Sequence, residues 1–283
     1  MKIVPILLYL LIYLQIICCY AQQKNENDLR AMNLKGNVRS TKEIEYKVKE
    51  EIFLTFGDIQ PSVIEGSENY TFDSIGNQTE CSRYFQNGSL IYKYTYKYDS
   101  IEHLIERKSF DKKENLLIKI TYKYDSSEYL IESKSFDKKE NLLMRIAFNY
   151  DSVNTIMEDY LNPDGSLKER WVHVQDGIGN TVDEKQYSSE GKLVYRFTST
   201  YDVFGNLTEG KSYKKNGKML YKYTYKCDSN NNLIEQNEFL PNGSFVLKNS
   251  YTYFFDKKGN WIKRITYVND VPKIITERNI EYF

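Results

Sequence analysis

Polar and apolar residues alternate strictly along several segments of about nine residues. In residues 90–98 the even positions are Leu, Tyr, Tyr, Tyr and Tyr, whereas the odd positions are Ile, Lys, Thr and Lys. The same alternation returns in residues 116–124 and 219–226. Successive side chains of a strand point to opposite faces of its sheet, so each segment is predicted to be a β-strand with one buried and one wet face. The two sets expected to be buried and exposed are, respectively, Tyr94, Tyr96, Ile120, Tyr122, Tyr223 and Tyr225, and Lys93, Lys97, Lys119, Lys123 and Lys222.

A 26-residue period runs through most of the chain. Eight aspartates mark it, with spacings of 26, 26, 26, 25, 26, 26 and 28 residues: Asp73, Asp99, Asp125, Asp151, Asp176, Asp202, Asp228 and Asp256. All of them except Asp151 are followed eleven positions later by an aromatic residue: Tyr84, Phe110, Phe136, Tyr187, Tyr213, Phe239 and Tyr267. A fixed period of this length indicates one supersecondary unit repeated many times.

Two turn signals divide each repeat. The first begins at the recurring Asp, whose side chain bonds backbone amides ahead of it, and in four repeats it closes with a Gly-Asn pair: Gly76-Asn77, Gly179-Asn180, Gly205-Asn206 and Gly259-Asn260. Glu102 and Glu128 replace the glycine in two units, and the fourth unit is one residue short. The second turn carries Asn-Gly, Asp-Gly or Glu-Gly, as at Asn87-Gly88 and Asn242-Gly243. The chain is therefore predicted to be all-β, with eight hairpin repeats forming an antiparallel meander of about sixteen strands.

If this sheet stayed flat, its tyrosine face would be exposed to solvent, and soluble proteins avoid apolar patches of that size. It must curl, pack against residues 25–67, or be covered by another protein or a glycan. Large twisted sheets tend to curl, so we expect a curled or solenoid-like sheet. The predicted domains are a signal peptide at 1–21, an N-terminal lead-in with one or two strands at 22–69, and the hairpin-repeat domain at 70–283.

The N-terminus has the pattern of a secretory signal peptide. Lys2 precedes an apolar run from Ile3 to Cys19, and Cys19-Tyr20-Ala21 places small residues where a signal peptidase would cut after Ala21. An uncleaved anchor and a lipidated cysteine are the alternatives. The protein is expected to be exported to the periplasm, the outer cell surface or the medium, with membrane contact only through this segment if it is not cleaved.

The best-formed repeats resemble a known family. The segments Thr200-Tyr201-Asp202-Val203-Phe204-Gly205-Asn206-Leu207 and Phe255-Asp256-Lys257-Lys258-Gly259-Asn260-Trp261 are similar to the YD (RHS-type) repeat. With the opening Leu34–Ser40, the chain resembles short secreted repeat proteins of Bacteroidetes-type bacteria. Long members of that family wrap their sheet into a hollow shell around a C-terminal toxin. The repeats here continue to within one strand of Phe283, so we expect no toxin domain and do not carry that function over.

Little in the sequence indicates catalytic or metal chemistry. The 39 basic and 39 acidic residues cancel, which argues against nucleic-acid binding. His103 and His173 have no metal-ligand partner at a suitable spacing, and the recurring aspartates are interpreted as turn formers rather than calcium ligands, because lysines fill their loops.

Recurring glutamates are expected to pair with lysines across strands (Glu106, Glu132, Glu158, Glu184, Glu209 and Glu235). Cys81 and Cys227 lie about six repeats apart, so only a sheet that closes on itself could bring them together. No enzyme activity, cofactor or metal is expected.

Two functions from different classes remain. The first is a non-enzymatic binding or scaffold surface in the bacterial envelope, with an unknown protein or glycan as its partner. The alternative is a carbohydrate-binding module that uses exposed tyrosine ladders. A membrane-spanning barrel of sixteen strands is rejected, because the short strands carry charges on both faces, as at Glu106, Arg107 and Lys108.

Overall fold

A computed structural model describes residues 28–48, 61–151 and 154–283 of the protein; the predicted signal peptide lies outside these ranges. One short helix, α2 (Asp28–Ala31), precedes the sheet. The strands, in order, are β1 (Val38–Val48), β2 (Pro61–Phe72), β3 (Gln78–Phe85), β4 (Leu90–Tyr98), β5 (Leu104–Phe110), β6 (Leu116–Tyr124), β7 (Leu130–Asp137), β8 (Leu142–Asp151), β9 (Thr155–Leu161), β10 (Leu167–Gln175), β11 (Thr181–Ser188), β12 (Leu193–Tyr201), β13 (Leu207–Lys214), β14 (Met219–Cys227), β15 (Leu233–Phe239), β16 (Phe245–Phe255), β17 (Trp261–Val268) and β18 (Val271–Tyr282).

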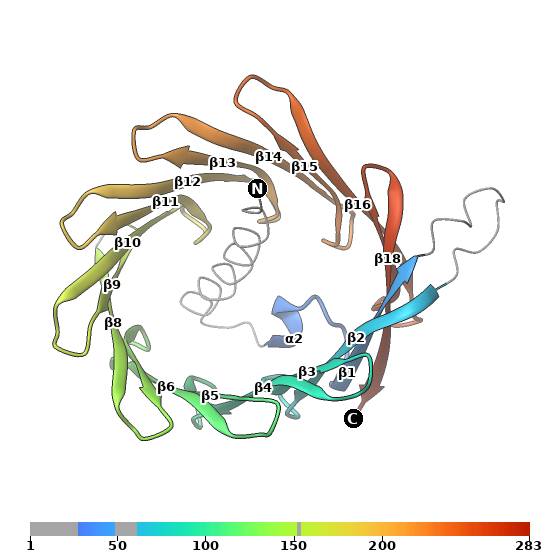
Figure 1. Ribbon diagram of the computed structural model, residues 1–283, viewed down its shortest axis with the longest axis horizontal. Helices are drawn as coiled ribbons and strands as arrows, with labels where there is room; N and C mark the ends of the chain where they lie inside the picture. The colour runs from blue at the N-terminus through green and yellow to red at the C-terminus, as the bar shows by residue number, and fades with distance from the viewer. Residues whose placement is uncertain (1–27, 49–60, 152–153) are drawn as a thin grey trace.

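The sheet is a closed barrel. Each strand pairs antiparallel with its sequence neighbours, and β1 pairs with both β2 and β18, so the 18-stranded sheet closes on itself (Figure 1). The all-β antiparallel meander is confirmed, whereas the expectation of a curled or solenoid-like sheet of sixteen strands was wrong. β1 and β2 complete the ring, and the seam between β1 and β18 satisfies the edge hydrogen bonds that an open sheet would expose. Closure does not join the cysteines, since both Cys81 and Cys227 are free.

The tyrosine face of the strands points into the barrel. Helix α2 lies inside the ring (Figure 1), and the hydroxyl of Tyr98 donates a hydrogen bond of 2.8 Å to Oδ2 of Asp28 on this helix. Leu29 and Leu34 form a small core with Val38 and Phe72. Ile280 of β18 also packs against this core. Because side chains alternate along each strand and paired residues share a face, these contacts fix which face is inner around the whole sheet.

Most of the inner tyrosines are half-buried rather than fully buried. Of the six residues predicted to be core, only Tyr223 is buried, and Tyr94, Tyr96, Ile120, Tyr122 and Tyr225 are intermediate. On the opposite face, Lys97 and Lys123 are exposed, while Lys93, Lys119 and Lys222 are half-buried. The sequence therefore predicted which side chains share the inner face and which the outer face, but not how deeply the inner ones are buried. Eighteen strands at ~4.8 Å spacing give a circumference of at least ~86 Å. The interior of a barrel this wide cannot be filled by the side chains of its wall alone.

The outer face carries ladders of ion pairs. Glu132 lies 2.8 Å from Lys134, and Glu209 lies 2.6 Å from Lys211. The cross-strand pairs include Lys93–Glu80, Arg145–Glu132, Arg196–Asp183, Lys222–Glu209 and Lys226–Glu235. Each exposed pair contributes little to stability, but together they give the outside of the barrel a polar, charged surface.

The recurring aspartates organise the turns at one end of the barrel. In seven of the eight turns the Asp Oδ1 accepts hydrogen bonds from the backbone N–H groups two and four residues later, as Asp202 does from Phe204 and Asn206. Hydrogen bonds from Asn206 hold the pKa of Asp202 below its usual value. Glu102 and Glu128 adopt the left-handed conformation of the glycines they replace, with φ of 71° and 67°. Asp111 and Asp137, which the sequence did not indicate, form the same turn at the opposite end.

The tyrosine that precedes the recurring aspartate ties neighbouring strands together. Its hydroxyl donates a hydrogen bond to the carbonyl oxygen of the residue twenty positions earlier, at the start of the preceding short strand. The bonds are 2.8–3.1 Å long and join Tyr98 to Gln78, Tyr124 to Leu104, Tyr150 to Leu130 and Tyr201 to Thr181. Phe255 precedes Asp256, and there Tyr253, three residues before the aspartate, makes the equivalent bond to Leu233. This contact gives the Tyr of the Tyr-Asp pair a structural role of its own.

Residues 28–37 bind to the aspartate turns from inside the ring. The N–H of Leu29 donates to the carbonyl of Gly76, and Nδ2 of Asn33 donates to the carbonyl of Asn230. Asn260 is almost fully buried and holds Lys35 twice: its Oδ1 accepts from the Lys35 N–H at 2.7 Å, and its Nδ2 donates to the Lys35 carbonyl at 2.8 Å. The N-terminal segment thus connects turns that are far apart in the sequence.

Replacing Asn260 with Ala is expected to lower the free energy of unfolding by about 2–4 kcal/mol, because the N–H and the carbonyl of Lys35, both part-buried, lose their hydrogen-bond partners. Guanidinium denaturation followed by tryptophan fluorescence would measure the change. Asn206→Ala is the matched control: this Asn occupies the same repeat position, but its amide bonds only the side chains of Asp202 and Asn231. Its loss should cost about 1 kcal/mol, and equal losses in the two variants would contradict this role for Asn260.

Candidate binding surface on the inner wall

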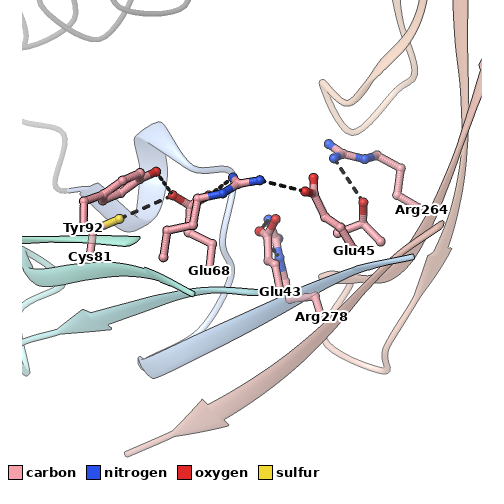
Figure 2. A network of polar contacts seen from close by, with 9 residues as sticks. Glu43, Glu45, Glu68, Cys81, Tyr92, Arg264 and Arg278 are labelled. Carbon is pink, nitrogen blue, oxygen red and sulfur yellow. Dashed lines mark hydrogen bonds and ion pairs between the residues drawn. The ribbon is translucent and has the colours of Figure 1, made fainter. Parts of the chain in front are cut away.

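A network of charged side chains crosses the seam where the barrel closes. It comes from β1, β2, β3, β4, β17 and β18 and points into the barrel (Figure 2). Arg83 lies 2.9 Å from Glu45 and 3.5 Å from Glu68, and Nε of Arg278 donates to Glu43 at 2.9 Å. Glu43 pairs directly with Glu68 on one side and with Arg278 on the other. Glu43, Glu45, Ser67, Glu68 and Arg83 line a small recess.

Glu68 is the centre of the acidic side of this network. Its Oε1 accepts a hydrogen bond of 2.8 Å from the Tyr92 hydroxyl and a contact of 3.7 Å from the Cys81 thiol. Burial, followed by the nearby charge of Glu68, raises the pKa of Cys81 and that of Tyr92. The thiol is therefore protonated at neutral pH, and a protonated thiol is neither a nucleophile nor a metal ligand.

The basic side of the network rests on a tryptophan. The guanidinium carbon of Arg278 lies 3.4 Å from the centroid of the Trp261 ring, and that of Arg264 lies 5.2 Å from it. Arg278 is only 7% exposed, and burial lowers its pKa, with Arg264 contributing in the same direction. Within the described residues, Nη1 of Arg278 and Nε of Arg264 are buried and have no hydrogen-bond partner. Both guanidinium groups have therefore lost hydration without gaining a hydrogen-bond acceptor for every buried N–H group.

Tyrosines extend this surface along the inner wall of β14 and β16. The rings of Tyr221 and Tyr223 have centroids 6.2 Å apart, and those of Tyr251 and Tyr253 are 6.5 Å apart with planes tilted by 32°. Tyr253 lies opposite Arg264 in the register, and its ring is 6.1 Å from that of Trp261. Aromatic side chains are therefore continuous with the arginines.

A second charged cluster lies around His173 on β10. Its Nε2 is 3.4 Å from Glu158, its Nδ1 is 3.3 Å from Glu184, and its ring stacks on Trp171 with 6.2 Å between centroids. Glu158 and Glu184 therefore point inward, contrary to their expected pairing with lysines. Asp159 and Asp183 take the outer ladder positions instead, beside Arg170, Lys185 and Arg196. Glu209 and Glu235 pair with lysines across strands on the outer face, as expected, whereas the lysine partners of Glu106 and Glu132 lie two residues away on the same strand.

Sequence reasoning did not find either cluster. The first cluster forms only where β1 joins β2 and β18 at the seam. The second lies on the neighbouring strands β9, β10 and β11, and its Glu158 and Glu184 were expected to pair with lysines instead. The one available signal was the doublet of acidic residues at Glu158-Asp159 and Asp183-Glu184, which places one carboxylate on each face of a strand. Across the described ranges, no group of three or more His, Cys, Asp or Glu side chains is arranged to hold a metal ion.

Comparison with known proteins assigns no family. No family model matches the chain, and no curated protein matches it. Among solved structures, a porin-like protein from Bacteroides uniformis is 15% identical, with 87% of this chain and 99% of that chain covered and a TM-score of 0.46. A second porin-like protein, from Bacteroides vulgatus, is 10% identical over 78% of this chain and 99% of that chain, with a TM-score of 0.38.

The pore of the Photorhabdus luminescens Tc holotoxin is also similar, at 14% identity and a TM-score of 0.32 over 77% of this chain and 12% of that chain. All three similarities are too low to define a family or a function. Within the part of the chain that the structure describes, no helix has the length and apolar content needed to cross a membrane.

Proposed function

We propose that the protein is a non-enzymatic, exported binding protein of the bacterial envelope, and that its ligand lies against the inner wall of the barrel. The observation that carries this proposal is the difference between the two faces. The inner wall combines half-buried tyrosines with two arginines, Arg264 and Arg278, each of which has one buried nitrogen without a hydrogen-bond acceptor, whereas the outer charges are paired in ladders. Aromatic and arginine side chains that are held in place but incompletely satisfied are typical of binding surfaces.

The outer face supports contact with water rather than with lipid. A lipid-facing barrel needs an apolar band around its outside. Here the middle of the outer face carries ion pairs such as Lys222–Glu209 and Arg196–Asp183. Export to the periplasm or the cell surface remains a proposal, which rests on the predicted signal peptide.

A carbohydrate-binding function is the second candidate, and the tyrosine rows favour it. Tyr221, Tyr251 and Tyr253 are half-buried on the inner wall, so part of each side chain stays accessible. Flat aromatic faces of this kind can cover the apolar faces of sugar rings. The two candidates share one surface and differ only in the ligand.

The test compares an inner and an outer tyrosine on neighbouring strands. The purified protein, without residues 1–21, would be applied to a glycan array and used in a pull-down from the envelope of its host. Tyr221→Ala changes the inner wall, whereas Tyr213→Ala changes an outer ring that is covered by Arg196 at 5.4 Å. Binding of the captured ligand should weaken about tenfold or more in Tyr221→Ala and stay unchanged in Tyr213→Ala.

Circular dichroism would confirm that both variants keep the wild-type fold. Loss of binding in the outer variant alone would overturn the inner-wall proposal. Turnover of a ligand that is abolished by mutating a single acidic residue would overturn the non-enzymatic part.

A further inference from the structure

We propose that the inner wall at β16–β18 binds the acidic group of an acidic saccharide, with Arg264 as the residue that pairs with it. The inference rests on the proposed function, because it requires that the inner wall is the ligand-binding face. It adds the chemical class of the ligand and the place where its charge is held.

Arg264 is a cation without a counter-ion. Among the described residues, no carboxylate lies within ion-pair distance of its guanidinium, whose hydrogen-bond partners are neutral: Nη2 donates to Oγ1 of Thr276 at 3.4 Å, and the Tyr253 hydroxyl is the other partner. By contrast, the other arginines of the network have carboxylate partners: Arg83 lies beside two glutamates and Arg278 beside one. An arginine presents planar, paired donors that match a carboxylate or a sulfate ester. Arg264 is therefore the position at which an anionic group of a ligand would contribute most to the binding free energy.

Arg278 adds to the positive potential at the same place. Glu43 accepts from Nε and Nη2 of Arg278, so that Nη1 is left buried and without an acceptor. Both guanidinium groups lie against Trp261, which holds them close together. An unsatisfied buried donor is costly, and an anion beside the pair would reduce this cost.

The surroundings of Arg264 favour a sugar as the carrier of the acid. Tyr253 is directly opposite Arg264, and Tyr251 follows on the same face, with its ring centroid 5.9 Å from the guanidinium carbon. Asn249 continues this row and supplies an amide donor and acceptor. The rings of Tyr251 and Tyr253, an amide and a guanidinium therefore lie side by side. An acidic peptide would pair with the guanidinium but would have no sugar ring to pack against the two tyrosines.

The experiment compares one sugar chain with and without its charge. A tetrasaccharide of galacturonic acid, its fully methyl-esterified form and a sulfated tetrasaccharide would each be titrated calorimetrically into the wild-type protein and into Arg264→Gln. The acid should bind wild type about tenfold or more tightly than the ester does, and Arg264→Gln should bind acid and ester alike. Binding of the sulfated chain at the same strength would identify the site as one for anionic sugars in general, and weaker binding would identify it as specific for carboxylates.

Two controls separate this inference from the proposed function. Arg196→Gln removes an outer arginine and should leave binding of the acid unchanged. If Tyr221→Ala weakens binding of a ligand while Arg264→Gln does not, the inner wall is still the binding face but the acidic site is refuted. Equal binding of acid and ester by wild type refutes the site without any variant. Tighter binding of a tetraglutamate peptide than of the acidic sugar, lost in Arg264→Gln, would refute the saccharide class.

Discussion

The barrel should unfold cooperatively as the pH rises above about 10, because the folded protein keeps its inner tyrosines protonated while the unfolded chain does not. Burial is the first cause in each case, and it raises the pKa of Tyr150 and of Tyr223 to about 12. The pKa is raised further still in six other tyrosines of the inner wall: Tyr70, Tyr92, Tyr96, Tyr124, Tyr195 and Tyr225.

The direction of the effect follows from proton binding. Between the unfolded pKa of about 10 and the folded values, the native state binds more protons than the unfolded state, so the free energy of unfolding falls as the pH rises. The contribution of each tyrosine is complete below pH 10 and is lost as the pH rises through its folded pKa, which is about 12 for Tyr150 and Tyr223. Each tyrosine contributes a slope of up to about 1.4 kcal/mol per pH unit. With a typical domain stability of 5–15 kcal/mol, unfolding is expected within about one to two pH units above 10.

A single tyrosine isolates this effect from the deprotonation of lysines. Tyr150→Phe removes a buried phenol whose hydroxyl donates to the Leu130 carbonyl at 2.8 Å. At pH 7 the variant should lose about 1 kcal/mol of stability. From pH 10 up to the pH at which the barrel unfolds, the free energy of unfolding of the variant should fall less steeply than that of wild type, by about 1.4 kcal/mol per pH unit. Urea denaturation at several pH values, with phenolate absorbance recorded in parallel, would measure both; identical slopes would contradict the linkage.

The hairpins were predictable because their causes are local. An aspartate such as Asp202 accepts hydrogen bonds from backbone amides two and four residues later, so five consecutive residues determine the turn. Strict alternation in β4 and β14 likewise showed which side chains share a face. Even where Glu102 replaces glycine, the aspartate bonds hold the turn in the left-handed conformation.

Closure was not predictable, because its cause is not local. β1 pairs with β18 through residues such as Glu43 and Arg278, which are separated by 235 positions in the sequence. β1 carries no repeat motif, and β2 meets the first aspartate turn only at its end. The candidate binding surface shares this property, because Glu43 reaches Arg278, and through it Trp261, only after the ring has closed. The closure also explains the half-buried tyrosines, since a ring of eighteen strands is too wide to be filled by its own wall.

Breaking the seam pair should destabilise the barrel strongly. In the Arg278–Glu43 pair the side chains are 6% and 16% exposed. Arg278→Met would leave the Glu43 carboxylate in the interior without its partner, and the free energy of unfolding should fall by about 3–5 kcal/mol. The outer pair Arg196–Asp183 is the matched control: its side chains are 40% and 18% exposed, and Arg196→Met should cost about 0–1 kcal/mol.

The double variant Glu43→Met with Arg278→Met decides between a lost charge pair and a lost packing contact. Replacing both charges removes the orphaned carboxylate, so most of the stability lost in Arg278→Met should return. Packing of Arg278 on Trp261 would be lost equally in the single and the double variant. Urea denaturation of the four proteins of this cycle gives the coupling energy directly. A double variant no more stable than Arg278→Met would show that the arginine stabilises the seam through Trp261 rather than through Glu43.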